Sequence, residues 1–134
     1  MRTWLPAALV LGALVGCGDT SDTSAGVLPA PTRLEVTQTT DRTQTWTLPC
    51  DPTGGDHPSP APACGAVMSL ERPFAPLAED VVCTQQYGGD QTARVTGVLR
   101  GMPVDLALSR TDGCRIAQWD RLGALLPGPV GVAP

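Results

Sequence analysis

The chain has no lysine, one histidine and only 4% aromatic residues. Its nine basic residues are all arginine and its formal net charge is -4. No basic stripe is available to neutralise phosphates, which argues against nucleic acid as a partner. With one histidine, no Ser-His-Asp set can be placed by a spacing argument, and no CxxC pair, phosphate loop or dinucleotide fingerprint occurs. The sequence therefore predicts a protein that is not an enzyme and needs no cofactor.

What the chain does contain is glycine, proline and cysteine. Its 134 residues are enough for one domain. Hydrophobic residues make up 42%, so a core can form, while 15 glycines and 14 prolines predict many loops around a small core. Five cysteines leave one without a partner inside the chain.

The amino-terminal segment accounts for the odd cysteine. Arg2 precedes an apolar run, 4–15, which has the length of a signal-peptide core and is too short to span a bilayer. Leu14-Val15-Gly16-Cys17 then resembles the bacterial lipobox, in which the cysteine is lipidated and becomes the new amino terminus. The alternative is an ordinary secretory signal followed by a stray cysteine.

The lipobox resemblance implies a lipoprotein held on the outer face of the cell membrane. Residues 1–16 would be the signal peptide and Cys17 the lipidated residue, and each buried acyl methylene contributes about 0.8 kcal/mol. Residues 17–31 are rich in Ser, Thr, Asp, Gly and Pro and predict a flexible tether.

Two hairpins are predicted from alternating polarity. The first has Leu34 and Val36 on one strand and Trp46 and Leu48 on the next, with a turn near Thr40-Asp41. In the second, Arg100-Gly101 suits a two-residue turn that sets Leu99 opposite Met102 on a buried face. The alternating apolar positions of this hairpin are Ala93, Val95, Leu99, Met102, Val104, Leu106 and Leu108.

One main helix is predicted between the hairpins. It begins at Pro62, places Cys64, Val67 and Met68 on one face, and stops at Pro73. A short second turn of helix is expected to begin at Pro76. The fold class is therefore α+β: an antiparallel sheet of four to five strands with one main helix and one short helix.

A loop rich in proline and glycine, 50–64, precedes the main helix. The loop offers only one histidine and two carboxylates as metal ligands, His57, Asp51 and Asp56. These are too few to indicate a site, so no metal is predicted. Its spacing, Cys-x-Pro, Gly-x-His-Pro and Ala-Cys, resembles the signature of the Streptomyces subtilisin inhibitor family. The residues that carry this resemblance are Cys50, Pro52, Gly55, His57, Pro58, Ala63 and Cys64.

The resemblance covers residues 32–122 and implies an actinobacterial, disulfide-bonded inhibitor. Four cysteines allow three connectivities, and the family's pairing would be Cys50 with Cys64 and Cys83 with Cys114. The remaining residues, 123–134, form a tail rich in proline and glycine in place of the aromatic last strand usual in the family.

The same resemblance implies a reactive-site loop that enters a protease cleft like a substrate. Its residues would be Cys83, Thr84, Gln85, Gln86 and Tyr87. Gln85 would fill the primary specificity pocket and Gln85-Gln86 would be the scissile bond. The implied partner is an extracellular serine protease, subtilisin-like or trypsin-like.

Departures from the family favour an alternative function. Gln85 is a polar neutral residue that suits neither an apolar nor an acidic specificity pocket, and Gly88-Gly89 predicts a flexible far end of the loop. These features, with the altered tail, favour a membrane-anchored, non-inhibitory binding module on the same scaffold. A homodimer is a further expected assembly, in which Trp119 lies either at the dimer face or in the core.

Overall fold

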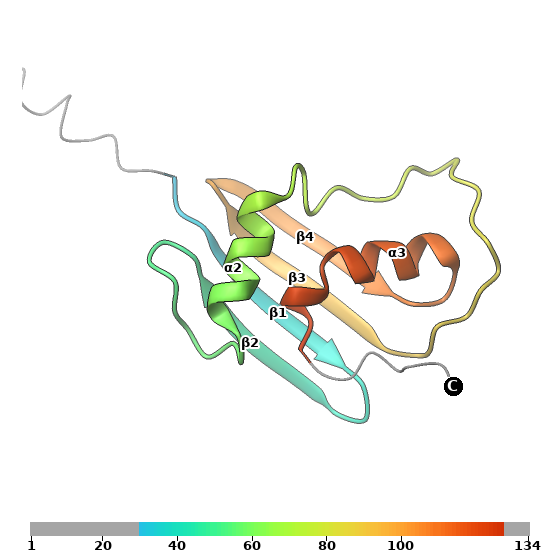
Figure 1. Cartoon of the computed structure of the whole chain (residues 1–134), viewed down its shortest axis with the longest axis horizontal. Helices are drawn as coiled ribbons and strands as arrows, with labels where there is room; N and C mark the ends of the chain where they lie inside the picture. The colour runs from blue at the N-terminus through green and yellow to red at the C-terminus, as the bar shows by residue number, and fades with distance from the viewer. Residues whose placement is uncertain (1–29, 128–134) are drawn as a thin grey trace, which may run out of the picture.

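The computed structural model describes residues 30–127, which form one antiparallel sheet covered by two helices (Figure 1). The elements are β1 (Arg33–Thr39), β2 (Thr43–Pro49), α2 (Pro60–Ser69), β3 (Thr92–Leu99), β4 (Met102–Ser109), α3 (Gly113–Arg121) and the short 3-10 helix η1 (Gly123–Leu125). The α+β class, the four strands and both disulfides are confirmed. The expected signal peptide, Cys17 and most of the tail lie outside the described residues.

The four strands are arranged in the order β2-β1-β3-β4. Strand β1 pairs antiparallel with both β2 and β3, and β4 forms an edge. The hairpin between β3 and β4 turns at Arg100 and Gly101, whose φ angles of 47° and 81° suit a two-residue turn that follows the sheet twist. The predicted register of Leu99 opposite Met102 is confirmed. Met102 was expected to be buried, but it is 68% exposed because it begins the edge strand at the very end of the sheet.

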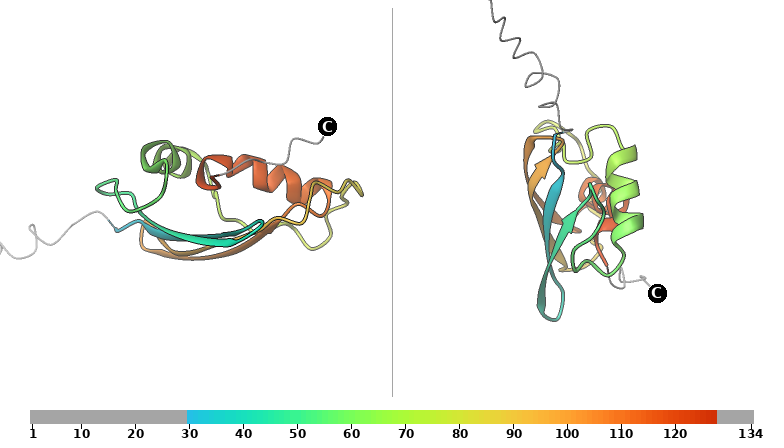
Figure 2. Two further views of the ribbon diagram at one scale, coloured as in Figure 1. Left: turned by 90° about the horizontal axis from the view of Figure 1, so that it is seen from below. Right: turned by 90° about the vertical axis from the view of Figure 1, so that its left-hand side faces the viewer.

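Both helices lie on one face of the sheet (Figure 2). That face carries the alternating apolar residues of all four strands, and helix α3 adds Trp119, which is 2% exposed. The core placement of Trp119 is therefore confirmed, and its ring is not available for a dimer face. Leu122, Leu125 and Leu126 are also buried, so the packed core runs past the expected domain end at Leu122.

Helix α2 is close to the predicted main helix, with two differences. It begins at Pro60 and ends at Ser69, before Pro73, where the N–H of Leu70 donates to the carbonyl of Ala66. Cys64 and Val67 face the core as predicted, but Met68 is 37% exposed. The buried face of α2 is therefore narrower than the spacing of its apolar residues predicts, because it leaves out Met68.

The second helix is not where it was expected. Residues 74–80 contain no helix, because so short a segment forms a stable helix only where it packs a buried face, and none of these residues is buried. The second helix is instead α3, which begins at Gly113 because the side chain of Asp112 accepts a hydrogen bond from the N–H of Arg115 at 2.9 Å. Within the described residues there is no fifth strand.

The other face of the sheet is polar. Threonine hydroxyls pair across β1 and β2, at 3.0 Å between Thr37 and Thr45 and 2.9 Å between Thr39 and Thr43. Arg94 and Asp105 form an exposed ion pair across β3 and β4 at 2.8 Å. This face of the sheet is therefore solvated.

Candidate functional site

The segment between α2 and β3 runs past α3 and turns at the end of the sheet away from the hairpin at Arg100-Gly101 (Figure 1). Residues 81–91 form no helix or strand. Within them Thr84, Gln85, Gln86 and Tyr87 are all exposed, Tyr87 to 66%. The structure thus places the predicted loop residues together on an accessible surface.

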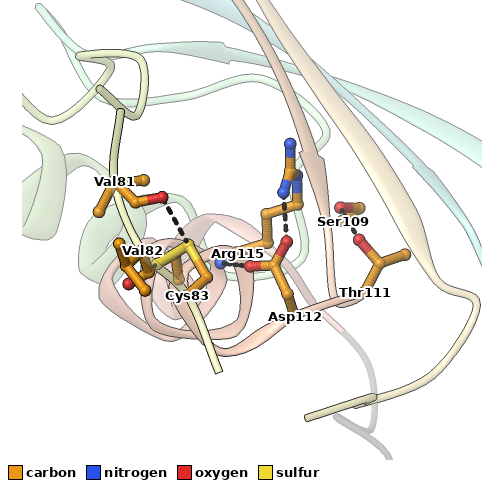
Figure 3. Close-up of polar contacts among 8 residues, drawn as sticks. Val81, Val82, Cys83, Ser109, Thr111, Asp112 and Arg115 are labelled. Carbon is orange, nitrogen blue, oxygen red and sulfur yellow. Dashed lines mark hydrogen bonds and ion pairs between the residues drawn. A yellow bond between two sulfur atoms is a disulfide. The ribbon is translucent and has the colours of Figure 1, made fainter. Parts of the chain in front are cut away.

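A disulfide holds the amino-terminal end of this loop. Cys83 is bonded to Cys114 in the first turn of α3, with 5.3 Å between their Cα atoms. Figure 3 shows this bond beside Asp112 and Arg115, with exposed Val82 on the loop side. The loop is therefore tied to the start of a helix that is itself packed on the sheet through Trp119.

Electrostatics strengthens the start of α3. The carboxylate of Asp112 accepts from the N–H of Arg115 and pairs with its guanidinium. The hydrogen bond from the Arg115 N–H, and then the side-chain bond to that guanidinium, hold the pKa of Asp112 below its ordinary value. An ionised carboxylate is also favourable at a helix amino terminus.

Thr84 lies directly against the first residue of α3. The N–H of Gly113 donates to the Thr84 carbonyl at 3.0 Å. A Cβ on Gly113 would clash with the hydroxyl oxygen of Thr84, so a residue with a side chain at this position would force the Thr84 side chain to move. This contact and the disulfide both act just before Gln85.

The carboxyl-terminal end of the loop is held by Arg110. The N–H of Gly88 donates to the Arg110 carbonyl at 2.7 Å, and the Arg110 side-chain Nε donates to the Gly88 carbonyl at 3.2 Å. A Cβ on Gly88 would meet the side chain of Ile116 at 2.8 Å. Gly88 was expected to loosen the loop, but both of its backbone polar groups are bound.

Between these two attachments the chain is unsupported. Gln85, Gln86 and Tyr87 make no hydrogen bond to any other described residue. Sequence reasoning identified this span but missed Arg110 and Gly113, which hold its ends. One sequence pattern could have revealed helix α3. Asp112 is a good helix-capping residue, and Trp119 and Leu122 follow it at helical spacing.

The loop closed by Cys50 and Cys64 has a structural arrangement. His57 is 3% exposed, its Nε2–H donates to the Leu125 carbonyl at 2.9 Å, and its Nδ1 accepts from the N–H of Ser59 at 3.0 Å. Both ring nitrogens of His57 are therefore occupied by protein partners. The rings of His57 and Trp46 meet edge to face at 6.0 Å between centroids.

No grouping in residues 30–127 is a convincing metal site. Cys83, Asp112 and Cys114 are close enough to share an ion, but the two sulfur atoms are bonded to each other and cannot act as thiolates. In the same part of the chain, no helix is long and apolar enough to cross a bilayer.

Comparison with known proteins agrees with this architecture. Residues 23–110 match the family described as subtilisin inhibitor-like. The chain is 39% identical over 75 residues to Subtilisin inhibitor-like protein 1 of Streptomyces cacaoi, covering 52% of this chain and 67% of that protein.

A crystal structure of Streptomyces caespitosus sermetstatin in complex with Bacillus licheniformis subtilisin is a more distant match. Its TM-score is 0.42 at 24% identity, over 79% of this chain and 100% of that one. The family match assigns the protein to protease inhibitors and not to enzymes, and the chain belongs to the subtilisin inhibitor-like family.

Proposed function

We propose that the protein inhibits a serine protease by presenting residues 83–87 as a substrate-like loop, with Gln85-Gln86 as the bond offered to the enzyme. One observation carries the proposal. Gln85, Gln86 and Tyr87 are exposed and unsupported, while the residues on either side are tied to one short segment, 110–114. A protease cleft needs such an accessible backbone, since it binds substrate through main-chain hydrogen bonds as well as side-chain pockets.

The physical basis of inhibition is preorganisation. A loop that is already held at Thr84 and Gly88 loses little conformational entropy on docking, so more of its contact energy becomes binding affinity. If the protease cuts Gln85-Gln86, Cys83 retains the new carboxyl end through its disulfide and Gly88 retains the new amino end. Cleavage is then slow or reversible because the ends stay close enough to rejoin.

The target is proposed to be subtilisin-like or trypsin-like. The name of the Streptomyces cacaoi relative supports a subtilisin-like enzyme. The Gln85 side chain is a weak ligand for either class, because an apolar pocket desolvates its amide and an acidic pocket offers it no opposite charge. We therefore expect modest affinity unless the natural target accepts medium-sized polar residues.

The amino-terminal anchor is part of the same proposal. We infer that Cys17 is lipidated and that residues 17–31 connect the domain to the outer face of the membrane. The carbonyl of Pro31 accepts from the N–H of Gly101, so the described chain begins beside the β3–β4 turn. The loop precedes the other end of β3, whose 8 residues span roughly 25 Å at the usual rise of a strand. An anchored molecule could therefore hold its loop away from the lipid.

The test is a titration of residues 18–134, with disulfides formed, against subtilisin, trypsin, chymotrypsin and a glutamyl-specific protease. Residual activity and integrity of the Gln85-Gln86 bond are followed together. Stoichiometric inhibition that is lost in Gln85→Gly supports the proposal. Gln85→Leu should tighten binding to subtilisin by about tenfold or more, since burial of a leucine contributes about 1.5–3 kcal/mol.

Two results would favour the non-inhibitory binding module instead. They are no inhibition of any protease, and rapid one-way cleavage at Gln85-Gln86 in the unmodified protein. Light scattering on the same sample tests the predicted homodimer. Globomycin-sensitive processing at Cys17 in an actinobacterial host tests the anchor.

A further inference from the structure

Arg110 is a buried arginine. It is 8% exposed, whereas the other arginines in residues 30–127 are all exposed. It lies between the end of β4 and the capping residue Asp112. Burying a guanidinium is costly unless its donors are satisfied, so its partners indicate what the site is built to hold.

Three contacts fix the guanidinium. One terminal nitrogen donates to the Asp120 carboxylate at 2.9 Å, and the group lies 5.8 Å from the centre of the Trp119 ring. The remaining contact, from Nε, goes to the carbonyl of Gly88 in the loop. Helix α3 therefore orients the Arg110 side chain, and Arg110 holds the loop.

Arg110 binds both backbone polar groups of Gly88. Arg110 accepts the Gly88 N–H with its own carbonyl and donates to the Gly88 carbonyl with its side chain. A Cβ at Gly88 would be 3.2 Å from the Arg110 Nε, so the absence of a side chain there allows this close approach. Gly88 follows Gln86 by two residues, so its position sets where the backbone after the proposed scissile bond lies.

We propose that Arg110 is a positioning residue for the reactive loop: it holds the segment after Gln85-Gln86 as the Cys83–Cys114 disulfide holds the segment before it. This inference rests on the proposed function for its meaning, but the contact itself can be tested without a target. Hydrolysis adds one water across the Gln85-Gln86 amide, leaving a carboxylate on Gln85 and an ammonium on Gln86. Resynthesis expels that water, and Arg110 favours it by keeping the amine end beside the carboxyl end.

The experiment compares Arg110→Met with Arg94→Met in the oxidised protein. Arg94 is the matched control, because it also forms short hydrogen bonds to an aspartate, but its side chain is 61% exposed and donates to Asp105 and not to the loop. Amide hydrogen exchange at Gly88 is measured by NMR, together with the cleavage rate of Gln85-Gln86 by subtilisin and global stability in urea. Arg110→Met should raise the hydrogen-exchange rate of the Gly88 amide at least about tenfold, and should raise the cleavage rate of Gln85-Gln86 by a similar factor.

Arg110→Lys separates positioning from packing. A lysine keeps the charge opposite Asp120 but cannot reproduce the planar arginine fork that also reaches Gly88. We expect Arg110→Lys to recover most of the global stability while Gly88 protection stays low. This variant also replaces Arg110→Met if the methionine substitution prevents folding.

Two results would overturn the inference. The first is wild-type Gly88 protection and cleavage rate in both Arg110 variants. The second is a loss of Gly88 protection that only follows global stability, or that Arg94→Met reproduces. If the wild-type protein inhibits nothing, the proposed function fails, yet the Gly88 exchange comparison still decides whether Arg110 positions the loop.

Discussion

Two disulfide-closed regions of this domain have opposite arrangements. The Cys50–Cys64 bond closes a loop whose central side chain, His57, points inward and binds the Leu125 carbonyl. The Cys83–Cys114 bond ties a loop whose central residues, Gln85 and Gln86, point outward and bind nothing in the described chain. A disulfide therefore limits where a loop can go, and the other contacts decide whether it serves the core or a partner.

The largest expected effects come from removing each disulfide in turn. Cys50→Ser with Cys64→Ser should lower the free energy of unfolding by about 3 kcal/mol, and Cys83→Ser with Cys114→Ser by about 4 kcal/mol, since the latter closes a longer loop. Urea denaturation measures both.

Loop integrity should separate the two disulfide variants. Only loss of the Cys83–Cys114 bond should allow rapid proteolysis at Gln85-Gln86 under conditions where the protein is still folded. Equal proteolysis of both variants would contradict the distinction between a structural loop and a presented loop.

An intermediate effect is expected from single side chains at the two loop centres. His57→Ala should lower the free energy of unfolding by about 2–3 kcal/mol, because it leaves the buried Leu125 carbonyl without its donor. Tyr87→Ala is the matched control: Tyr87 is 66% exposed, so its substitution should leave the free energy of unfolding unchanged. Protease affinity should show the reverse pattern: Tyr87→Ala should weaken binding, whereas His57→Ala should not.

The smallest effect concerns acid. Asp56 accepts from the backbone and hydroxyl of Thr47, and Asp112 accepts from the backbone of Arg115. These hydrogen bonds hold the pKa of each carboxyl below its ordinary value. A lowered folded-state pKa gives stability that is present above the unfolded value and lost as the pH falls through the folded value. Unfolding midpoints followed from pH 6 to pH 2 should therefore fall less steeply in Asp56→Asn and in Asp112→Asn.

The same two carboxylates should also differ between the regions. Asp112→Ala should increase loop cleavage at neutral pH, because alanine removes the cap of the helix to which Cys83 is tied. Asp56→Ala should not, since Asp56 binds β2 beside the other loop. Equal cleavage of the two variants would show that the cap has no influence on the loop.

Much of the fold could be predicted because its signals are local. Alternation around Val36 and Val95 indicates strands, and Arg100-Gly101 indicates a two-residue hairpin turn with its register. The position of α3 was missed because Thr111-Asp112-Gly113 favours a turn and a helix cap equally well until the residues after it are given weight. The exposure of Met102 could not be predicted, since alternation does not say where the covering helices end.

The sequence by itself determined the strand pattern, the turns, the cysteine positions and the accessible run from Thr84 to Tyr87. Tertiary structure alone decided how that run is held: Arg110 binds Gly88 across 22 positions of sequence, and His57 binds Leu125 across 68. A local pattern depends on backbone geometry that repeats every few residues, and so it can be recognised in the sequence. A contact between distant residues depends on how whole elements pack, and the same arginine would be an exposed charge if α3 lay elsewhere.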